Sequence, residues 1–401
     1  MSENDNVASI EHLLRDTVRD VIDRSAYGDW RTIATAEAVP LSYGFPDPAL
    51  FPAEELIESV EGVIREKGDD ALQYGGGEYS DRLAEFVAQR EREKGIEEEV
   101  LLTNGATHAI DSVCRAFLDP GDHILVEAPT FMGALGVFWN YGVDITGIPL
   151  DEAGMDVDAL ATELETRRET DRELPKLLYT IPDFHNPTGT TLSRDRRERL
   201  LELAAEYDFA ILEDGAYTDL WYGGEAPPPL ASLDDSGRVI RVGTFSKTVA
   251  PGVRLGWLTA PDRIRTATRT VAPGGTNTFT RSVVGWYCDQ GHFERVLPTL
   301  RDAYADRRDR MLDSLAAQMP EGVTWTEPDG GFFLWVELPA EIDTDAMLEP
   351  AADTGVTYLP GSLFYPGDRG TNALRLSFAP VDSEQLDSGI RALADTIEES
   401  M

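Results

Sequence analysis

Residues 243–257 read Gly-Thr-Phe-Ser-Lys-Thr-Val-Ala-Pro-Gly-Val-Arg-Leu-Gly-Trp. Small and hydroxyl-bearing residues surround Lys247, and Arg254 follows seven positions later. The chain has only three other lysines, all in settings typical of a surface: Lys67, Lys94 and Lys176. A lysine amine in such a segment can form an imine with an aldehyde and later carry a proton. Lys247 is therefore the candidate for lysine chemistry, and the alternative is a loop cation.

The segments around this stretch alternate between short apolar runs and helical patterns from about Val100 to Thr259. Such alternation predicts an α/β domain with a mostly parallel sheet flanked by helices. The last hundred residues mix helical and strand patterns, which predicts a smaller α+β domain. In the α/β domain, the expected strands are 123–127, 177–182, 209–213 and 239–242, and the expected helices are 107–118 and 193–207. In the α+β domain, helices are expected at 292–317, near 344–354 and from 383, and strands at 332–337 and 374–378.

The N-terminal region begins with an amphipathic helical pattern over 8–26, which is typical of an arm. A loop rich in proline and glycine is expected over 40–52, followed by helices at 53–67 and 79–94. We therefore predict three parts. Residues 1–70 form the N-terminal arm and part of the small domain, 71–290 form the large domain, and 291–401 form the C-terminal small domain.

Two polar groups follow predicted strands of the large domain. Asp214 comes directly after the run 209–213, and Tyr217 follows three residues later. In α/β sheets, ligands gather at the carboxyl ends of strands. A carboxylate there can keep a pyridine nitrogen protonated. The alternatives are helix capping by Asp214 and packing by Tyr217.

Two further motifs have the pattern of a cofactor site. The turn Asn186-Pro187-Thr188-Gly189 follows the run 177–182, and Asn186 could donate a hydrogen bond to a ring oxygen; a tight loop is the alternative. Residues 103–107, Thr-Asn-Gly-Ala-Thr, precede a helical stretch and lack acidic side chains. A helix N-terminus of this kind offers backbone N–H groups to a phosphate.

The composition excludes several classes of partner. With 73 acidic against 35 basic residues, the formal net charge is −38. This charge opposes nucleic acids and anionic membranes, so we expect neither as a partner. Acidity spread along the whole chain is typical of a halophile. Two cysteines, Cys114 and Cys288, match no disulfide framework or zinc cluster, and we expect no metal. The acidic N-terminus and the absence of any membrane-length apolar run predict a cytoplasmic protein.

Together and in this order, these segments resemble fold-type I enzymes that use pyridoxal 5′-phosphate (PLP). Among them, the chain resembles the class I/II aminotransferases, in the branch of aromatic-amino-acid, kynurenine and 2-aminoadipate aminotransferases. The resemblance covers almost the whole chain, and its most specific segment is 246–256. It implies transfer of an amino group from an L-amino acid to a 2-oxo acid such as 2-oxoglutarate, by a ping-pong mechanism.

The resemblance also implies roles for individual residues. Lys247 would hold PLP as a Schiff base, Asp214 would pair with the pyridine nitrogen, and Asn186 and Tyr217 would bind the ring hydroxyl. Arg375, Asn186 and Gly44 would face the substrate, with Arg375 gripping its α-carboxylate. Six positions would contact the phosphate: Gly105, Ala106, Thr107, Thr244, Ser246 and Arg254. Phe131 would stack on the ring. Tyr74 would contact the phosphate of a neighbouring subunit in a homodimer with shared sites. For Tyr74 the alternative is a buried turn residue.

Several positions depart from the common pattern of this branch, among them Thr107-His108, Gly215-Ala216 and the two that follow. Phe131 stands where tyrosine is frequent, and His185 replaces the usual glutamine before the Asn186 turn. The same fold also serves β-lyases, and related regulators fuse an aminotransferase-like domain to a DNA-binding domain. The strong acidity and the short segment before the matching region argue against the regulator.

Overall fold

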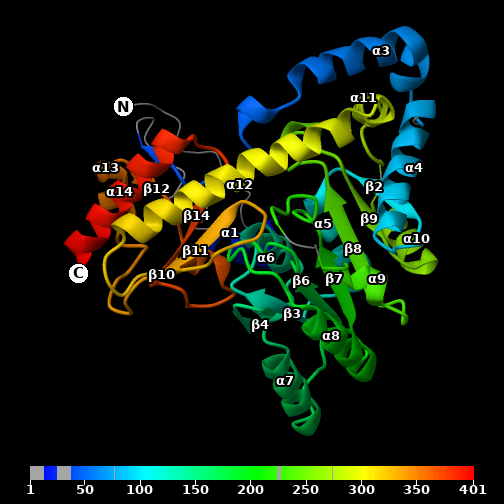
Figure 1. Ribbon diagram of the computed structural model, residues 1–401. Helices are drawn as coiled ribbons and strands as arrows, with labels where there is room; N and C mark the ends of the chain where they lie inside the picture. The colour runs from blue at the N-terminus through cyan, green and yellow to red at the C-terminus, as the bar shows by residue number, and fades with distance from the viewer. Residues whose placement is uncertain (1–12, 25–37, 76, 224–226, 273) are drawn as a thin grey trace, which may run out of the picture.

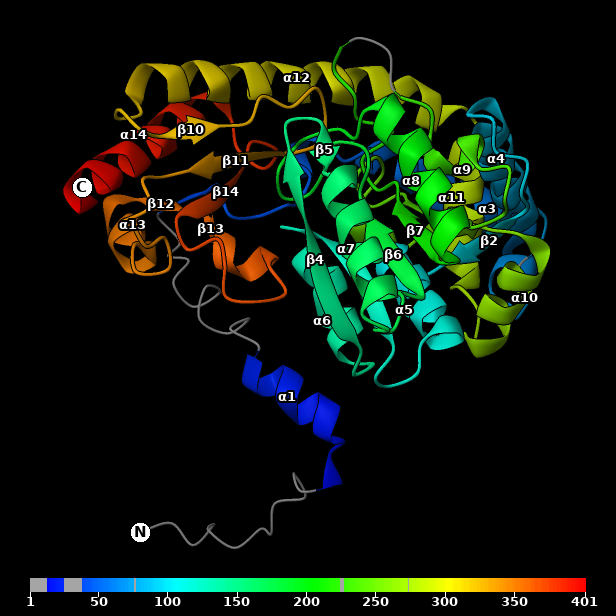
Figure 2. The same cartoon turned by 90° about the horizontal axis from the view of Figure 1, so that it is seen from below.

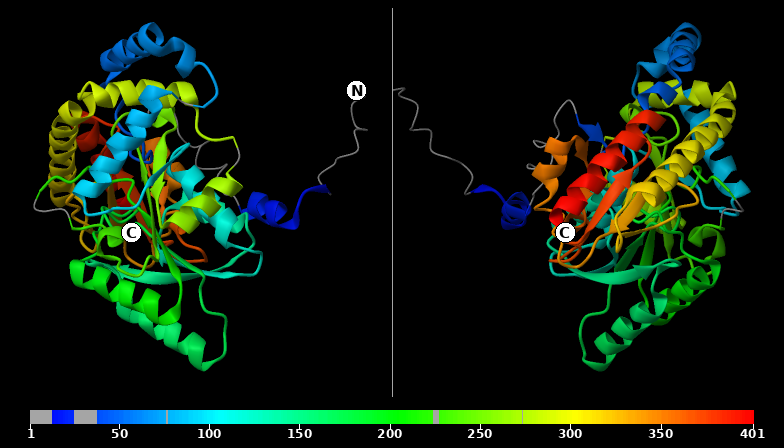
Figure 3. Two further views of the ribbon diagram at one scale, coloured as in Figure 1. Left: turned by 90° about the vertical axis from the view of Figure 1, so that its right-hand side faces the viewer. Right: turned by 60° about the vertical axis from the view of Figure 1, so that its left-hand side comes forward.

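The computed structural model describes residues 13–24, 38–75, 77–223, 227–272 and 274–401. A long helix, α12 (His292–Gln318), runs from the large sheet to a smaller one (Figure 1). Part of the predicted arm helix, residues 8–12 and 25–26, lies outside the described residues. Within them, α1 (Asp16–Arg24) lies at the edge of the molecule (Figure 3), where Arg15 donates to the Asn140 carbonyl at 3.4 Å.

The large domain is built on an eight-stranded sheet with the order β2-β9-β8-β7-β6-β3-β4-β5. Its centre, from β8 to β4, is parallel, while β9 is antiparallel to both of its neighbours and β5 is antiparallel to β4. The sheet is therefore mostly parallel, as predicted. The strands are β2 (Val100–Thr103), β3 (His123–Ala128), β4 (Asp144–Asp151), β5 (Gly154–Met155), β6 (Leu177–Thr180), β7 (Ala210–Asp214), β8 (Val239–Thr244) and β9 (Gly256–Thr259).

Helices cover both faces of this sheet because its central strands are apolar on both sides. On β6, Leu177 and Tyr179 join the core formed with α5 and α6, whereas Leu178 joins the core formed with α7 and α8. Figure 2 shows α7 and α8 side by side over the sheet. The helices of the two faces are α5 (Ala106–Phe117), α6 (Met132–Trp139), α7 (Val157–Glu169), α8 (Arg194–Tyr207) and α9 (Leu230–Leu233).

Another group of helices packs beside the β2 end of the sheet. These helices are α3 (Ala53–Ala71), α4 (Glu78–Glu93), α10 (Asp262–Val271) and α11 (Thr278–Asp289). The backbone of α3 leaves helical geometry at Lys67, where φ is −143° and ψ is 35°. The predicted end of this helix at 67 therefore coincides with a kink, and the helix continues beyond it.

The small domain contains a four-stranded antiparallel sheet with the order β10-β11-β14-β13. The N-terminal loop joins this domain because Val39 and Pro40 pair with Val356 and Thr357. The elements are β1 (Val39–Pro40), β10 (Thr324–Trp325), β11 (Phe333–Glu337), α13 (Leu348–Thr354), β12 (Val356–Thr357), β13 (Leu359–Pro360), β14 (Ala373–Ser377) and α14 (Ser383–Ser400), with short 3₁₀ turns at Pro48–Leu50, Pro251–Val253 and Gly361–Phe364.

Two details differ from the sequence predictions. Helix α13 begins at Leu348 rather than near Thr344, because the Thr344 hydroxyl and N–H both bond to carbonyls of 371–373 and hold this residue outside the helix. Ser193 occupies the N-cap position of α8, but its side chain makes no capping hydrogen bond. The remaining predicted helices and strands of the described region differ from the observed ones mainly at their ends.

Candidate active site

Lys247 lies in the loop after β8, at the carboxyl edge of the large sheet. Its Nζ donates a hydrogen bond to the Gly44 carbonyl at 2.9 Å and lies 5.5 Å from the centre of the Tyr217 ring. Burial, followed by the positive charges of Arg375 and Arg254, lowers the pKa of this amine from 10.5 to about 8. Burial therefore favours the neutral form of Lys247, which can act as a nucleophile or base.

Asp214 ends β7 and points into the same region. One carboxylate oxygen accepts a hydrogen bond from the Tyr179 hydroxyl at 2.8 Å, and the other accepts one from the Ala216 N–H at 3.1 Å. The residue is 4% exposed, and burial raises its pKa above the usual value. A buried carboxylate favours a cationic partner, so this position suits a protonated ring nitrogen.

Arg375 comes from β14 of the small domain and reaches the turn that carries Asn186. Its Nη1 donates to Asn186 Oδ1 at 2.9 Å, and its Nη2 donates to the Ser42 carbonyl at 2.8 Å. Its Nε is buried without a hydrogen-bond partner among the described residues. Burial lowers the pKa of this guanidinium to about 10. An organic anion would satisfy such a buried cation.

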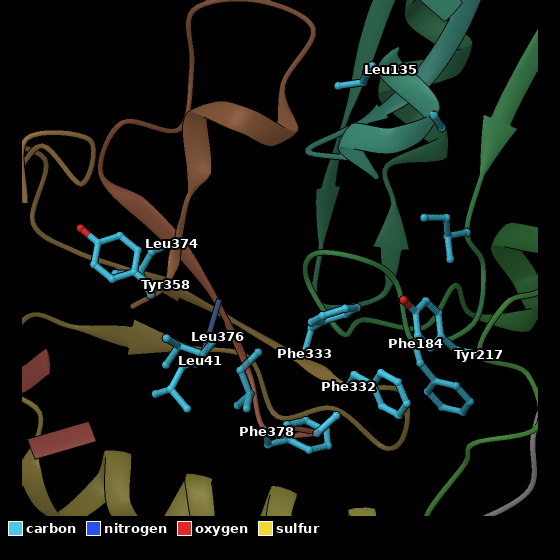
Figure 4. Packing of buried hydrophobic residues seen from close by; sticks show 14 of the residues in the cluster. Leu41, Leu135, Phe184, Tyr217, Phe332, Phe333, Tyr358, Leu374, Leu376 and Phe378 are labelled. Carbon is cyan, nitrogen blue, oxygen red and sulfur yellow. The ribbon is translucent and has the colours of Figure 1, made fainter. Parts of the chain in front are cut away.

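Aromatic rings contact both Lys247 and Arg375. Tyr217 contacts Phe332 and Phe333 edge to face, with ring centres 5.6 and 5.7 Å apart, and Figure 4 shows these rings gathered at the centre of the core. The Phe333 ring also lies 4.2 Å from the Arg375 guanidinium. Burial raises the pKa of Tyr217 well above its usual value, so its hydroxyl stays protonated and can donate a hydrogen bond.

A cluster of hydroxyl, guanidinium and backbone N–H groups lies at the N-terminus of α5. Thr244 donates to the Ser246 hydroxyl at 2.9 Å, and a Cβ at Gly105 would lie 2.8 Å from Arg254 Nη2. Gly105 has φ of 88°, and no side chain of the described region caps the helix that starts at Ala106. Thr107 follows in the first turn. Free N–H groups beside an arginine suit a phosphate.

Two predicted positions border this region. Phe131 stands at the N-cap of α6, where its ring covers Gly133 so closely that a Cβ there would lie 2.4 Å away. Gly44 faces Phe333, whose ring a Cβ would approach to 2.8 Å. Positions 133 and 44 are glycines because a Cβ at either position would collide with the ring that lies over it.

Tyr74 is the predicted site residue that does not join the others. It lies between α3 and α4 with 97% of its surface exposed, so the alternative of a buried turn residue is wrong. Ile57, Val60 and Ile64 on the neighbouring helix α3 are also exposed. Exposed apolar residues along one helix are typical of a surface that another chain covers.

The sequence did not single out the residues that support the site from behind. In the sequence Tyr179 belongs only to an apolar strand pattern, yet its hydroxyl contacts Asp214. Glu127 lies near the end of β3, accepts hydrogen bonds from the Thr180 hydroxyl and the Ile181 N–H, and lies 3.1 Å from His185 Nε2. Tyr179 and Glu127 are polar residues in otherwise apolar strands, and this is the sequence feature that could have marked them as part of the site.

The described residues hold no candidate metal centre. Among them, no group of three or more His, Cys, Asp or Glu side chains could hold a metal ion, and Cys114 and Cys288 are buried thiols. Of the helices described, none is long and apolar enough to cross a membrane.

Comparison with known proteins identifies the family. Residues 47–393 match the family described as aminotransferase class I and II. The chain is 40% identical to aromatic-amino-acid aminotransferase 1 of Thermococcus litoralis over 92% of this chain and 90% of that one. It also resembles the crystal structure of a multiple substrate aminotransferase from Thermococcus profundus, with 39% identity, a TM-score of 0.94, and coverage of 98% of this chain and 99% of the other.

A third relative was solved with a phosphopyridoxyl derivative of an amino acid. The α-aminoadipate aminotransferase of Thermus thermophilus, solved with N-(5′-phosphopyridoxyl)-L-leucine, is 33% identical with a TM-score of 0.83, and the match covers 96% of this chain and 95% of that one. The groups around Lys247 fit such a molecule. The N-terminus of α5 suits its phosphate, the buried Asp214 carboxylate suits its ring nitrogen, and the buried Arg375 suits its carboxylate. The chain therefore belongs to the class I and II aminotransferases, fold-type I enzymes that transfer amino groups with PLP as cofactor.

Proposed function

We propose that this aminotransferase accepts aromatic L-amino acids among its donors and 2-oxoglutarate as its preferred acceptor, by a ping-pong mechanism. One observation carries this proposal. Lys247 Nζ and Arg375 Nη2 both donate to the same short loop, at Gly44 and Ser42 respectively. The base and the carboxylate-binding cation therefore both lie next to this loop and beside aromatic rings, which suits an α-amino acid with an aromatic side chain.

We assign the following roles to the residues of this site. Arg375 binds the substrate α-carboxylate, and Asn186 orients its guanidinium and the ring hydroxyl of PLP. Lys247 would hold the cofactor, and its free amine would take the proton from the substrate Cα and carry it to the next acceptor. Bound PLP supplies an electron sink for the pair of electrons left at Cα. Asp214 holds the proton on the ring nitrogen, and Tyr217 donates to the ring hydroxyl.

The phosphate and the ring have their own binding groups. The N–H groups of 105–107, the hydroxyls of Thr244 and Ser246 and the Arg254 guanidinium bind the phosphate. Phe131 stacks on the ring, and Gly44 lets the N-terminal loop approach the substrate. The oxo acid from the first substrate leaves before the second oxo acid binds, because both use Arg375.

We also propose a homodimer in which Tyr74 of each chain contacts the phosphate of the other. The exposure of Tyr74 and of the apolar stripe on α3 supports it. The pairing of β1 with β12 supports placing the N-terminal loop in the small domain, and the break between α11 and α12 at residues 290–291 supports a boundary near 290. The boundary near 70 stays a prediction, because α3 packs against α11 of the large domain. The net charge of −38 supports a halophilic origin, and a cytoplasmic location stays a prediction.

A panel of amino donors with 2-oxoglutarate tests the assignment. We expect glutamate to form with aromatic donors, and parallel initial-velocity lines when both substrates are varied. Formation of pyruvate and ammonia from a single amino acid would instead indicate a β-lyase. Lys247→Ala, as a control, should abolish turnover.

A mixing experiment tests the shared site. Inactive Tyr74→Phe and Lys247→Ala chains are combined, and mixed dimers are isolated. If Tyr74 serves the partner, one site of each mixed dimer carries both lesions and the other is intact, so part of the activity returns. Mixed dimers without such recovery would contradict the shared site.

A further inference from the structure

Tyr179 lies beneath the candidate cofactor ring site, on the parallel strand β6 next to β7. Its side chain is fully buried, and its hydroxyl donates to Asp214 Oδ2 at 2.8 Å. The ring edge packs against Phe138 of α6, with ring centres 5.4 Å apart, which fixes the direction of the hydroxyl. Neither residue was identified by the sequence as part of the site.

The two oxygens of Asp214 have different donors. Oδ1 is held by the backbone N–H of Ala216, which a side-chain substitution does not remove, whereas Oδ2 depends on one side chain. Arg241 and Lys247 add favourable charge to Asp214, while burial, followed by the charge and hydrogen bond of Asp214, raises the pKa of Tyr179, so that its hydroxyl keeps its proton. The hydroxyl is therefore a fixed donor to a carboxylate that burial would otherwise tend to neutralise.

We infer that Tyr179 is a positioning residue that keeps Asp214 ionised and aimed at the ring nitrogen of PLP. The inference deepens the proposed function, since it rests on the assignment of Asp214 to that nitrogen. A hydrogen bond to a charged group in a buried site is stronger than one between neutral groups. Its loss should therefore weaken the hold of Asp214 on the nitrogen without removing any other contact to the cofactor.

The test is a double-mutant cycle on the full chain, with Tyr179→Phe, Asp214→Asn and both changes together. The readouts are the PLP dissociation constant by equilibrium dialysis and the pH midpoint of the visible absorbance of the bound cofactor. Tyr358→Phe is the matched control, because its hydroxyl is equally buried and donates to the Thr344 carbonyl far from these residues. Thermal unfolding of each variant reports general loss of stability.

We expect Tyr179→Phe to weaken PLP binding roughly tenfold, or about 1.4 kcal/mol, and Tyr358→Phe to leave it unchanged. In Tyr179→Phe, the pH midpoint of the cofactor absorbance should move upwards. The ring nitrogen is then less protonated, so its positive charge repels the proton on the Lys247 nitrogen more weakly. In the Asp214→Asn background, Tyr179→Phe should have little further effect on either readout.

Two outcomes would overturn the inference about Tyr179. These are an unchanged dissociation constant and midpoint in Tyr179→Phe, or an equal loss in both backgrounds, which would mean that Tyr179 acts on the fold and not through Asp214. A different outcome concerns the proposed function itself. If Asp214→Asn binds PLP as the wild type does and keeps the same midpoint, Asp214 does not pair with the ring nitrogen.

Discussion

Replacement of Arg375 tests the binding of the substrate carboxylate most directly. In Arg375→Ala, the buried site loses both guanidinium donors that now bond to Asn186 and the Ser42 carbonyl. Hydrogen bonds to charged groups contribute about 1.5–3 kcal/mol each, so two of them contribute about 3–6 kcal/mol. The lower value applies here because the guanidinium already has two neutral acceptors before substrate binds. The expected loss of amino-acid affinity is thus roughly 100-fold.

The assay follows kcat/KM for an aromatic amino acid and the inhibition constant of 3-phenylpropionate, which has the carboxylate but no amine. The affinity for both ligands should fall together, while the visible absorbance of the bound cofactor stays. Arg375→Lys keeps the charge but not the paired donors, so its loss should be intermediate. Arg369→Ala, at an exposed position of the small domain, is the control. Equal affinities of wild type and Arg375→Ala for both ligands would refute the reasoning.

Three other predictions follow from separate features. The rate of PLP incorporation into the cofactor-free chain should rise with pH and level off above about 8, because the attacking amine must be neutral and its pKa is lowered to about 8; a midpoint near 10 by stopped-flow absorbance would contradict this. Gly105→Ala should weaken PLP binding in equilibrium dialysis, because its Cβ would displace Arg254; Gly252→Ala, where a Cβ meets nothing within 4 Å, is the control. Arg241→Ala should destabilise folding by about 3–5 kcal/mol in chemical denaturation, because it leaves Glu213 buried without its cation and Glu91 with Lys94 alone. A loss no larger than that of Arg310→Ala, at an exposed ion pair, would show that the Arg241 pairs contribute little.

The sequence predicted much of the site because its residues follow strands. Asp214 ends β7, Lys247 follows β8 and Asn186 follows β6, and parallel neighbours bring their carboxyl ends to one edge of the sheet. The strand patterns were predictable for the same reason, since central parallel strands are apolar on both faces. The antiparallel direction of β9 could not be predicted, because the hydrophobic pattern of a strand carries no information about its direction.

By itself, the sequence determined the family and the cofactor, because these can be identified from short motifs and their order along the chain. It also predicted Lys247 as the lysine that holds the cofactor. Tertiary structure alone decided which distant groups meet: Arg375 with Asn186, 189 positions apart, and Tyr179 with Asp214, 35 apart. It also decided that Tyr74 lies exposed while Tyr179 is buried. A buried donor becomes functional only through the acceptor that packing places against it, and packing is a property of the whole chain.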